Sequence, residues 1–151
     1  MKYIIISTIT ILLFSLNASS EEFKLTSPSG DITINISVTD QISYSVSFKN
    51  MNILQPSMLS MQLDNGISWG IKPKITKKEA NSKSETIVPV VPRKFQKIES
   101  SYNFLRLTFK GNYQLEFRAY NDGVAYRWET DIKKEINLII PIRVIPAVFE
   151  L

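Results

Sequence analysis

The sequence predicts an all-β protein, an antiparallel β-sandwich that follows an N-terminal signal-peptide helix. Beyond residue 20, apolar and polar residues alternate in one short run after another, which is the pattern of strands with one buried face. Turn-forming Gly, Pro, Asn and Asp residues separate these runs, and no segment after residue 20 has the period of an amphipathic helix. Sheets with one apolar face must bury it, so two stacked sheets are favoured, with a closed barrel as the alternative.

Residues 1–20 have the layout of a signal peptide. Lys2 gives a positive start, the run from Tyr3 to Leu16 is apolar apart from Ser and Thr, and small residues follow at Ala18 and Ser20. The apolar run is shorter than the roughly 20 residues that a membrane-spanning helix needs, although an uncleaved anchor is the alternative. We therefore expect export to the periplasm or secretion from a bacterial cell, with contact to the membrane only through the signal peptide.

The composition excludes several classes of chemistry. The chain contains no Cys and no His, so it has no disulfide, no thiol nucleophile, no Ser-His-Asp triad and no ordinary zinc or haem site. The formal net charge is only +4, and the basic residues between Lys72 and Lys97 are organised on no predicted helix or aromatic-rich sheet. We expect no nucleic-acid partner, and one domain that is stabilised by its core alone.

Alternating runs near the start predict the first strands. A short strand around Phe23–Leu25 ends at the turn Ser27–Gly30. Two alternating strands follow, over Ile32–Val38 and Ile42–Phe48, and they are separated by Asp40 and Gln41. We expect these two strands to pair as an antiparallel hairpin.

The middle of the chain is less regular. The segment Lys49–Pro56 is punctuated by Asn and Pro and is not among the predicted strands, whereas Leu59–Leu63 alternates again. A strand is expected to begin at Trp69 and to run into the lysine-rich segment. The polar stretch Asn81–Ser84 predicts a loop, and the β-branched stretch Glu85–Val91 predicts another strand.

The most distinct local signal is a hairpin over residues 114–130. Its strands cover Gln114–Tyr120 and Val124–Thr130, and they flank the turn triplet Asn121-Asp122-Gly123, in which we expect Gly123 to take a positive φ. Alternation places six side chains on the predicted core face: Leu115, Phe117, Ala119, Val124, Tyr126 and Trp128.

Paired carboxylates are the one catalytic arrangement that the composition leaves open, because glycosidases use two Asp or Glu residues. Glu116 and Glu129 lie on the polar face of the predicted hairpin, beside Arg118 and Arg127. Cross-strand ion pairing explains this placement more simply than catalysis does. We therefore predict no catalytic residue.

Two further sets of residues are candidates for binding sites. Asp64 and Asp122 lie in Asp-Asn-Gly and Asn-Asp-Gly turns without the spacing of a calcium loop, so we predict no metal site. Trp69 and Tyr120 are aromatic residues that would stack on sugar rings if exposed, and they are the candidate carbohydrate contacts, although a place in the core is the alternative.

Several blocks of sequence, in order, resemble the N-terminal domain of glycoside hydrolase family 97. They run from residue 25 to 130 and are Leu25–Gly30, Ile42–Val46, Pro56–Ser57, Gly66–Trp69, Glu85–Thr86 ahead of Pro89–Val90, Tyr102–Asn103 and Tyr120–Arg127. The resemblance implies a large β-sandwich that precedes a catalytic (β/α)8 barrel, in exported bacterial α-glucosidases or α-galactosidases with calcium at the active site. The chain has no counterpart of the parts that carry the family's catalytic carboxylates and calcium ligands.

These observations lead to three expected regions: a signal peptide over residues 1–20, a sandwich over 21–130 that is incomplete, and a divergent apolar tail over 131–151. We expect a non-catalytic domain of a family 97 glycoside hydrolase, present as a fragment without its barrel and without a cofactor. The expected partners are a carbohydrate, α-glucan or α-galactoside, and the missing barrel domain. The alternatives are a stand-alone exported sugar-binding protein and a structural or adhesive sandwich.

Overall fold

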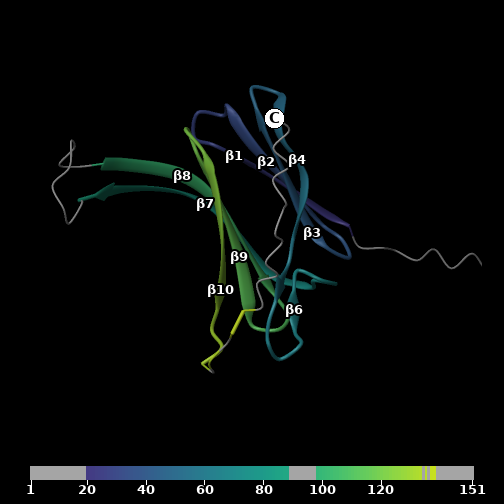
Figure 1. The fold of residues 1–151 in the computed structure, drawn as a ribbon. Helices are drawn as coiled ribbons and strands as arrows, with labels where there is room; N and C mark the ends of the chain where they lie inside the picture. Colours follow the sequence, from purple (N-terminus) through teal and green to yellow (C-terminus); the bar gives the residue numbers. More distant parts are fainter. Residues whose placement is uncertain (1–19, 89–97, 134, 136, 139–151) are drawn as a thin grey trace, which may run out of the picture.

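The computed structural model describes residues 20–88, 98–133, 135, 137 and 138, and its regular elements are antiparallel strands (Figure 1). They form two four-stranded sheets, in the orders β1-β2-β3-β4 and β10-β9-β8-β7, and a small sheet of β5 and β6. The strands are β1 (Glu21–Thr26), β2 (Ile32–Val38), β3 (Ile42–Phe48), β4 (Met51–Leu59), β5 (Met61–Gln62), β6 (Ser68–Trp69), β7 (Ile75–Ile87), β8 (Ile98–Phe109), β9 (Tyr113–Tyr120) and β10 (Val124–Thr130). The predicted all-β antiparallel sandwich is confirmed.

Two predictions concern the ends of the chain. The predicted signal peptide falls on residues that lie outside the described part, apart from residue 20. Of the predicted apolar tail, residues 131–133, 135, 137 and 138 are described, and Leu138 forms a bridge with Leu63. Within the described residues, no helix is long and apolar enough to cross a membrane.

The predicted first hairpin is confirmed. β2 pairs with β3 in the register Ile34↔Val46 and Ile36↔Tyr44. The alternating isoleucines of β2 are buried on one face, as expected for a strand with one face on the core.

The segment Met51–Leu59 forms strand β4, so the break expected over Lys49–Pro56 is wrong. Pro56 is tolerated because β4 is the edge strand of its sheet, and the pairing with β3 is interrupted by a register shift between Tyr44 and Val46. A proline at such a bulge removes no donor that a neighbouring strand requires.

The polar stretch Asn81–Ser84 also forms strand rather than the predicted loop, because it lies within the 13 residues of β7. β8 supplies the partners of this stretch, in the register Asn81↔Phe104 and Ser84↔Ser101, and its residues 98–101 extend past the end of β9. The polar side chains reinforce this pairing, with Ser82 Oγ donating to Asn103 Oδ1 at 2.6 Å. The result is a two-stranded extension of β7 and β8 beyond the sandwich (Figure 1).

The hairpin of β9 and β10 is confirmed, with the register Leu115↔Trp128 and Phe117↔Tyr126. The expected burial holds fully only for the β9 half. Tyr126 is 44% exposed, although it lies on the predicted face, because β10 is an edge strand that the opposite sheet covers only partly. Trp128 is partly buried and packs against the core.

The turn of this hairpin differs from the prediction. Gly123 does not take a positive φ, and a Cβ added there would meet no atom within 4 Å. The turn is closed by the Tyr120 amide, which donates to the Gly123 carbonyl at 2.8 Å. Asn121 Oδ1 accepts from the Ser29 amide at 2.8 Å and so links this turn to the turn between β1 and β2. The positive φ that the sequence assigned to Gly123 is found elsewhere, for example at Gly70.

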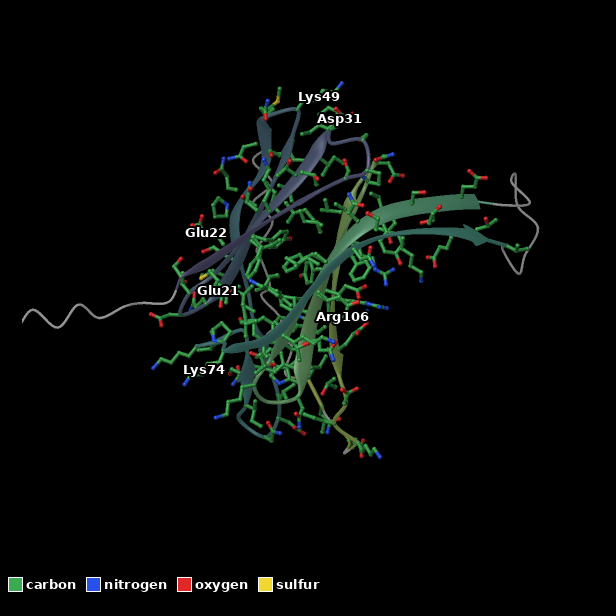
Figure 2. All side chains as sticks on the ribbon, turned by 180° about the vertical axis from the view of Figure 1, so that it is seen from behind. Glu21, Glu22, Asp31, Lys49, Lys74 and Arg106 are labelled. Carbon is green, nitrogen blue, oxygen red and sulfur yellow. The ribbon has the colours of Figure 1, made fainter. Side chains whose placement is uncertain are left out.

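The core lies between the two sheets, where Figure 2 shows side chains filling the interior. Its members come from both sheets, and each fully buried aliphatic or aromatic side chain contributes about 1.5–3 kcal/mol relative to an exposed one. The most deeply buried apolar residues are Ile34, Ile36, Ile42, Leu63, Leu107, Leu115, Phe117 and Ala119.

Gly70 holds the short strand β6 against this core. Its φ is +82°, and a Cβ there would lie 2.3 Å from the Leu59 carbonyl oxygen. Only glycine fits such a close approach of two backbones in this conformation. The strand expected to continue from Trp69 into the lysine-rich segment therefore ends at Trp69, and β7 begins anew at Ile75.

Candidate functional site

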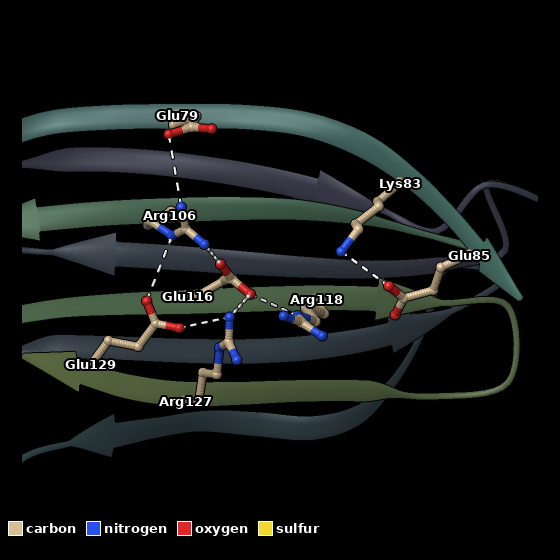
Figure 3. A network of polar contacts seen from close by, with 8 residues as sticks. All are labelled: Glu79, Lys83, Glu85, Arg106, Glu116, Arg118, Arg127 and Glu129. Carbon is tan, nitrogen blue, oxygen red and sulfur yellow. Dashed lines mark hydrogen bonds and ion pairs between the residues drawn. The ribbon is translucent and has the colours of Figure 1, made fainter. Parts of the chain in front are cut away.

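The outer face of the β10-β9-β8-β7 sheet carries a network of charged side chains (Figure 3). Alternation places these residues opposite the core face, and the register sets Arg106 of β8, Glu116 of β9 and Arg127 of β10 side by side across three strands. Arg118 follows Glu116 on the same face of β9.

Glu116 is the centre of the network and is only 1% exposed. One carboxylate oxygen, Oε1, accepts from Arg118 Nε at 2.6 Å and lies 3.1 Å from Arg127 Nη2. The other oxygen accepts from Arg106 Nη2. A buried carboxylate is tolerated only with such partners, and here three guanidinium groups supply them.

These partners set the charge state of Glu116. Burial raises the pKa of its carboxyl, but hydrogen bonds from Arg118 and Arg106, together with the positive charge of both groups, outweigh burial and lower the pKa below its ordinary value of 4.5. Glu116 is therefore ionised at neutral pH.

Two further carboxylates complete the network. Glu129 Oε1 lies 2.6 Å from Arg127 Nη2, and its Oε2 lies 3.9 Å from Arg106 Nε. Glu79 Oε2 lies 4.0 Å from Arg106 Nη1. Three arginines thus face three glutamates, and their formal charges cancel.

The predicted ion pairing of Glu116 and Glu129 with Arg118 and Arg127 is confirmed. Sequence reasoning missed Arg106, which comes from β8 and contacts all three glutamates. Its only signal was a charged residue on the polar face of an alternating strand. Its partners follow from the strand register, which the sequence does not specify.

This geometry does not suit acid–base catalysis. A glycosidase acid needs a raised pKa, so that it holds a proton to donate, whereas the pKa of Glu116 is lowered and its oxygens are occupied by arginines. Among the residues that the structure describes, no group of three or more acidic side chains is placed to hold a metal ion. The network is best explained as a set of ion pairs around a buried carboxylate that stabilises the pairing of β8, β9 and β10.

The structure separates the two candidate sugar contacts. Trp69 is 4% exposed, and its ring stacks on Tyr113 with centroids 5.2 Å apart, so it presents no free face to a sugar. Tyr120 lies at the end of β9 on the outer face and is partly exposed. Trp69 therefore lies in the core, and Tyr120 remains the candidate carbohydrate contact.

Tyr120 is fixed by its neighbours. Its ring centroid lies 4.9 Å from that of the buried Tyr102, and the Arg118 guanidinium lies 4.6 Å from the centroid of Tyr102. Beside it is a small hollow of about 100 Å³, lined by Glu116, Arg118, Tyr120, Ala125, Tyr126 and Arg127. The hollow admits no more than the edge of a sugar ring.

Comparisons with known proteins point to one family. The family model described as "Glycosyl-hydrolase 97 N-terminal" matches residues 25–141 of this chain. A curated relative, a retaining alpha-galactosidase of Bacteroides thetaiotaomicron, is 36% identical over 121 residues, which are 80% of this chain and 18% of the relative.

Solved structures agree with this match. A glycoside hydrolase family 97 enzyme from Pseudoalteromonas sp. strain K8, in complex with acarbose, superposes with a TM-score of 0.66 at 27% identity, over 77% of this chain and 19% of the enzyme. A variant of that enzyme in complex with panose gives the same values. A beta-arabinopyranosidase shares the fold, with a TM-score of 0.63 at 19% identity. The chain spans about a fifth of the length of these proteins.

Proposed function

The chain belongs to the glycoside hydrolase family 97 N-terminal domain family, and on this premise we propose that it is a non-catalytic, carbohydrate-associated β-sandwich module. It acts beside the catalytic barrel of an α-glucosidase or α-galactosidase. The observation that carries the proposal is the family match over residues 25–141, which includes every strand from β2 to β10.

The site geometry supports a non-catalytic role. The carboxylates nearest to a catalytic pair, Glu116 and Glu129, both lie in the arginine network. Hydrolysis by this module would require one of them to leave its ion pairs and gain a proton. We assign bond cleavage to the barrel that the family resemblance implies.

The ligand class follows from the relatives. One is named a retaining alpha-galactosidase, and another is solved with panose and with acarbose. We propose α-glucosyl or α-galactosyl oligosaccharides as ligands, with Tyr120 as a contact. The family resemblance implies calcium in full-length members. Among the described residues, no group of acidic side chains is placed to hold a metal ion, so the function proposed for this chain does not use calcium.

We further propose that the protein is exported. The proposal rests on the charged start, apolar run and small residues of the first 20 positions. Fusion of residues 1–20 to a reporter that is active only outside the cytoplasm tests it. A reporter that stays inactive contradicts export.

Assay of the chain from Glu21 onward tests the non-catalytic role. With nitrophenyl α-glucoside or α-galactoside and calcium present, we expect no release of nitrophenol. Release that is abolished by Glu116→Gln or Glu129→Gln would overturn the proposal. Titration with panose and with an α-galactosyl trisaccharide tests the ligand class, for which we expect weak binding that Tyr120→Ala reduces.

A further inference from the structure

The outer face of the other sheet, β1-β2-β3-β4, has a different chemistry. Its centre carries short uncharged side chains, and the register sets Ser37 beside Ser43 and Asn35 beside Ser45. Strand β1 adds Glu22 opposite Ser37 on the same face. Figure 2 labels Glu22 on this sheet and Arg106 on the opposite one.

This face is hollowed into a groove of about 390 Å³ that crosses the strands. Glu22, Phe23 and Lys24 of β1 and Pro56 of β4 line its sides. The middle is lined by β2 and β3, with the short polar residues Asn35, Ser37, Ser43 and Ser45 and with Ile36 and Tyr44 between them. The bulge between β3 and β4 lies at Pro56, and bulges bend and twist a sheet locally. The volume is within the range of small-molecule sites, about 300–1,000 Å³.

The polar groups in the groove are not used by the fold. Among the described residues, no side-chain hydrogen bond involves Asn35, Ser37, Ser43 or Ser45. Each hydroxyl can both donate and accept, as can the Asn35 amide. The groove therefore offers mixed donors and acceptors at fixed spacing along two paired strands.

The charge and polarity of the groove indicate the class of ligand that it would bind. Glu22 and Lys24 carry opposite charges, so the groove has no net charge to attract an anion or a cation. The side chains that β2 and β3 direct into the groove are hydroxyls and an amide, because these residues alternate with Tyr44, whose ring points to the interior and contacts the rings of Phe117 and Tyr126. A neutral ligand rich in hydroxyl groups matches both features.

We propose that this groove is a binding site for a neutral oligosaccharide, with Asn35, Ser43 and Ser45 as hydrogen-bonding residues. The sugar hydroxyls exchange donor and acceptor roles with these side chains, while Glu22 accepts and Lys24 donates at one end. Short side chains lose little rotamer freedom on binding, which lowers the cost of association. The inference rests on the proposed carbohydrate function and assigns it a site remote from Tyr120.

The experiment is an NMR titration of the isotope-labelled chain from Glu21 onward with panose. Ser45→Lys places a long charged side chain in the groove, and we expect it to weaken binding at least fivefold. Ser47→Lys is the matched control, because Ser47 lies two residues further along β3 on the same face and does not line the groove. A thermal melt of each variant checks that the fold is retained.

The outcomes separate the site from the function. Shifts at the amides of Ser43 and Ser45, with loss of binding in Ser45→Lys alone, support the groove. Shifts at Tyr120 with unchanged binding by Ser45→Lys overturn the groove and leave the proposed function intact. Equal weakening by Ser45→Lys and Ser47→Lys also overturns the groove, and absence of panose binding by the parent chain overturns both.

Discussion

The two outer faces of the sandwich use polar residues in opposite ways. On the β10-β9-β8-β7 sheet, long charged side chains cover one another and bury Glu116. On the β1-β2-β3-β4 sheet, short hydroxyl and amide side chains line an open groove and take part in no side-chain hydrogen bond among the described residues. On the first face, the charged side chains pair with one another and stabilise the fold. On the second face, the polar side chains in the groove remain available to a ligand.

The difference shows why charge alone is a poor guide to a binding site. The charged residues of the β9–β10 hairpin are a visible signal in the sequence, but in the structure they pair with one another and with Arg106 and so stabilise the sheet, as expected for Glu116 and Glu129. A groove of serines carries no such sequence signal, yet its donors and acceptors remain open to solvent. Substitutions on the charged face should therefore lower the free energy of unfolding, whereas substitutions in the groove should weaken ligand binding.

The largest effect is expected from Glu116→Ala. Removal of this carboxylate leaves Arg106, Arg118 and Arg127 close together with less compensating charge, and breaking a buried ion pair costs about 3–5 kcal/mol. Urea denaturation followed by fluorescence measures the loss in the free energy of unfolding.

Glu85→Ala is the control for that measurement. Glu85 pairs with Lys83 at 3.0 Å on the same sheet, but Lys83 is exposed and Glu85 is partly exposed, so the loss should be far smaller. Equal losses for the two substitutions would show that burial of Glu116 does not organise this face.

Acid should weaken the charged face selectively. The pKa of Glu116 is lowered in the folded state, so its contribution is fully present above the ordinary value of 4.5 and is lost as the pH falls through the folded-state pKa. We expect the free energy of unfolding to fall less between pH 6 and pH 3 in Glu116→Gln than in the parent, since this residue then binds no proton. Parallel pH profiles for the two proteins would contradict the prediction.

An intermediate effect should distinguish the arginines. Arg118 donates to Glu116 at 2.6 Å and lies over the Tyr102 ring, with a side chain that is 22% exposed. Arg127 is 50% exposed. We expect Arg118→Ala to cost about 1.5–3 kcal/mol and Arg127→Ala less than about 1 kcal/mol, and chemical denaturation of both tests the order. The reverse order would place the centre of the network at β10.

Much of the fold could be predicted because period-two alternation is a local property. The pairing of β2 with β3 and of β9 with β10 follows from it directly. The errors concern residues whose state depends on distant partners. Asn81–Ser84 is strand because it pairs with Ser101–Phe104 of β8, and position 70 requires glycine because the Leu59 carbonyl oxygen approaches it from another strand.

The candidate sites were less predictable. The pairs of Glu116 and Glu129 could be anticipated within one hairpin, but Arg106 joins them only through the register of β8. The position of Trp69 depends on Tyr113 and Trp128, which lie far along the chain. The groove is formed by residues of four strands and by a bulge, so no local sequence pattern predicts it.

The smallest effect on stability is expected in the groove itself. The double substitution of Ser43 and Ser45 by Ala removes two hydroxyls that form no side-chain hydrogen bond within the described residues, so no partner is left unsatisfied. We expect the free energy of unfolding to change by no more than about 0.5 kcal/mol, as for ordinary surface sites, while panose binding weakens measurably. Denaturation and titration of the same variant test both halves. A loss of stability comparable to that of Glu116→Ala would mean that the hydroxyls of Ser43 and Ser45 also stabilise the fold, and the contrast between the two faces would disappear.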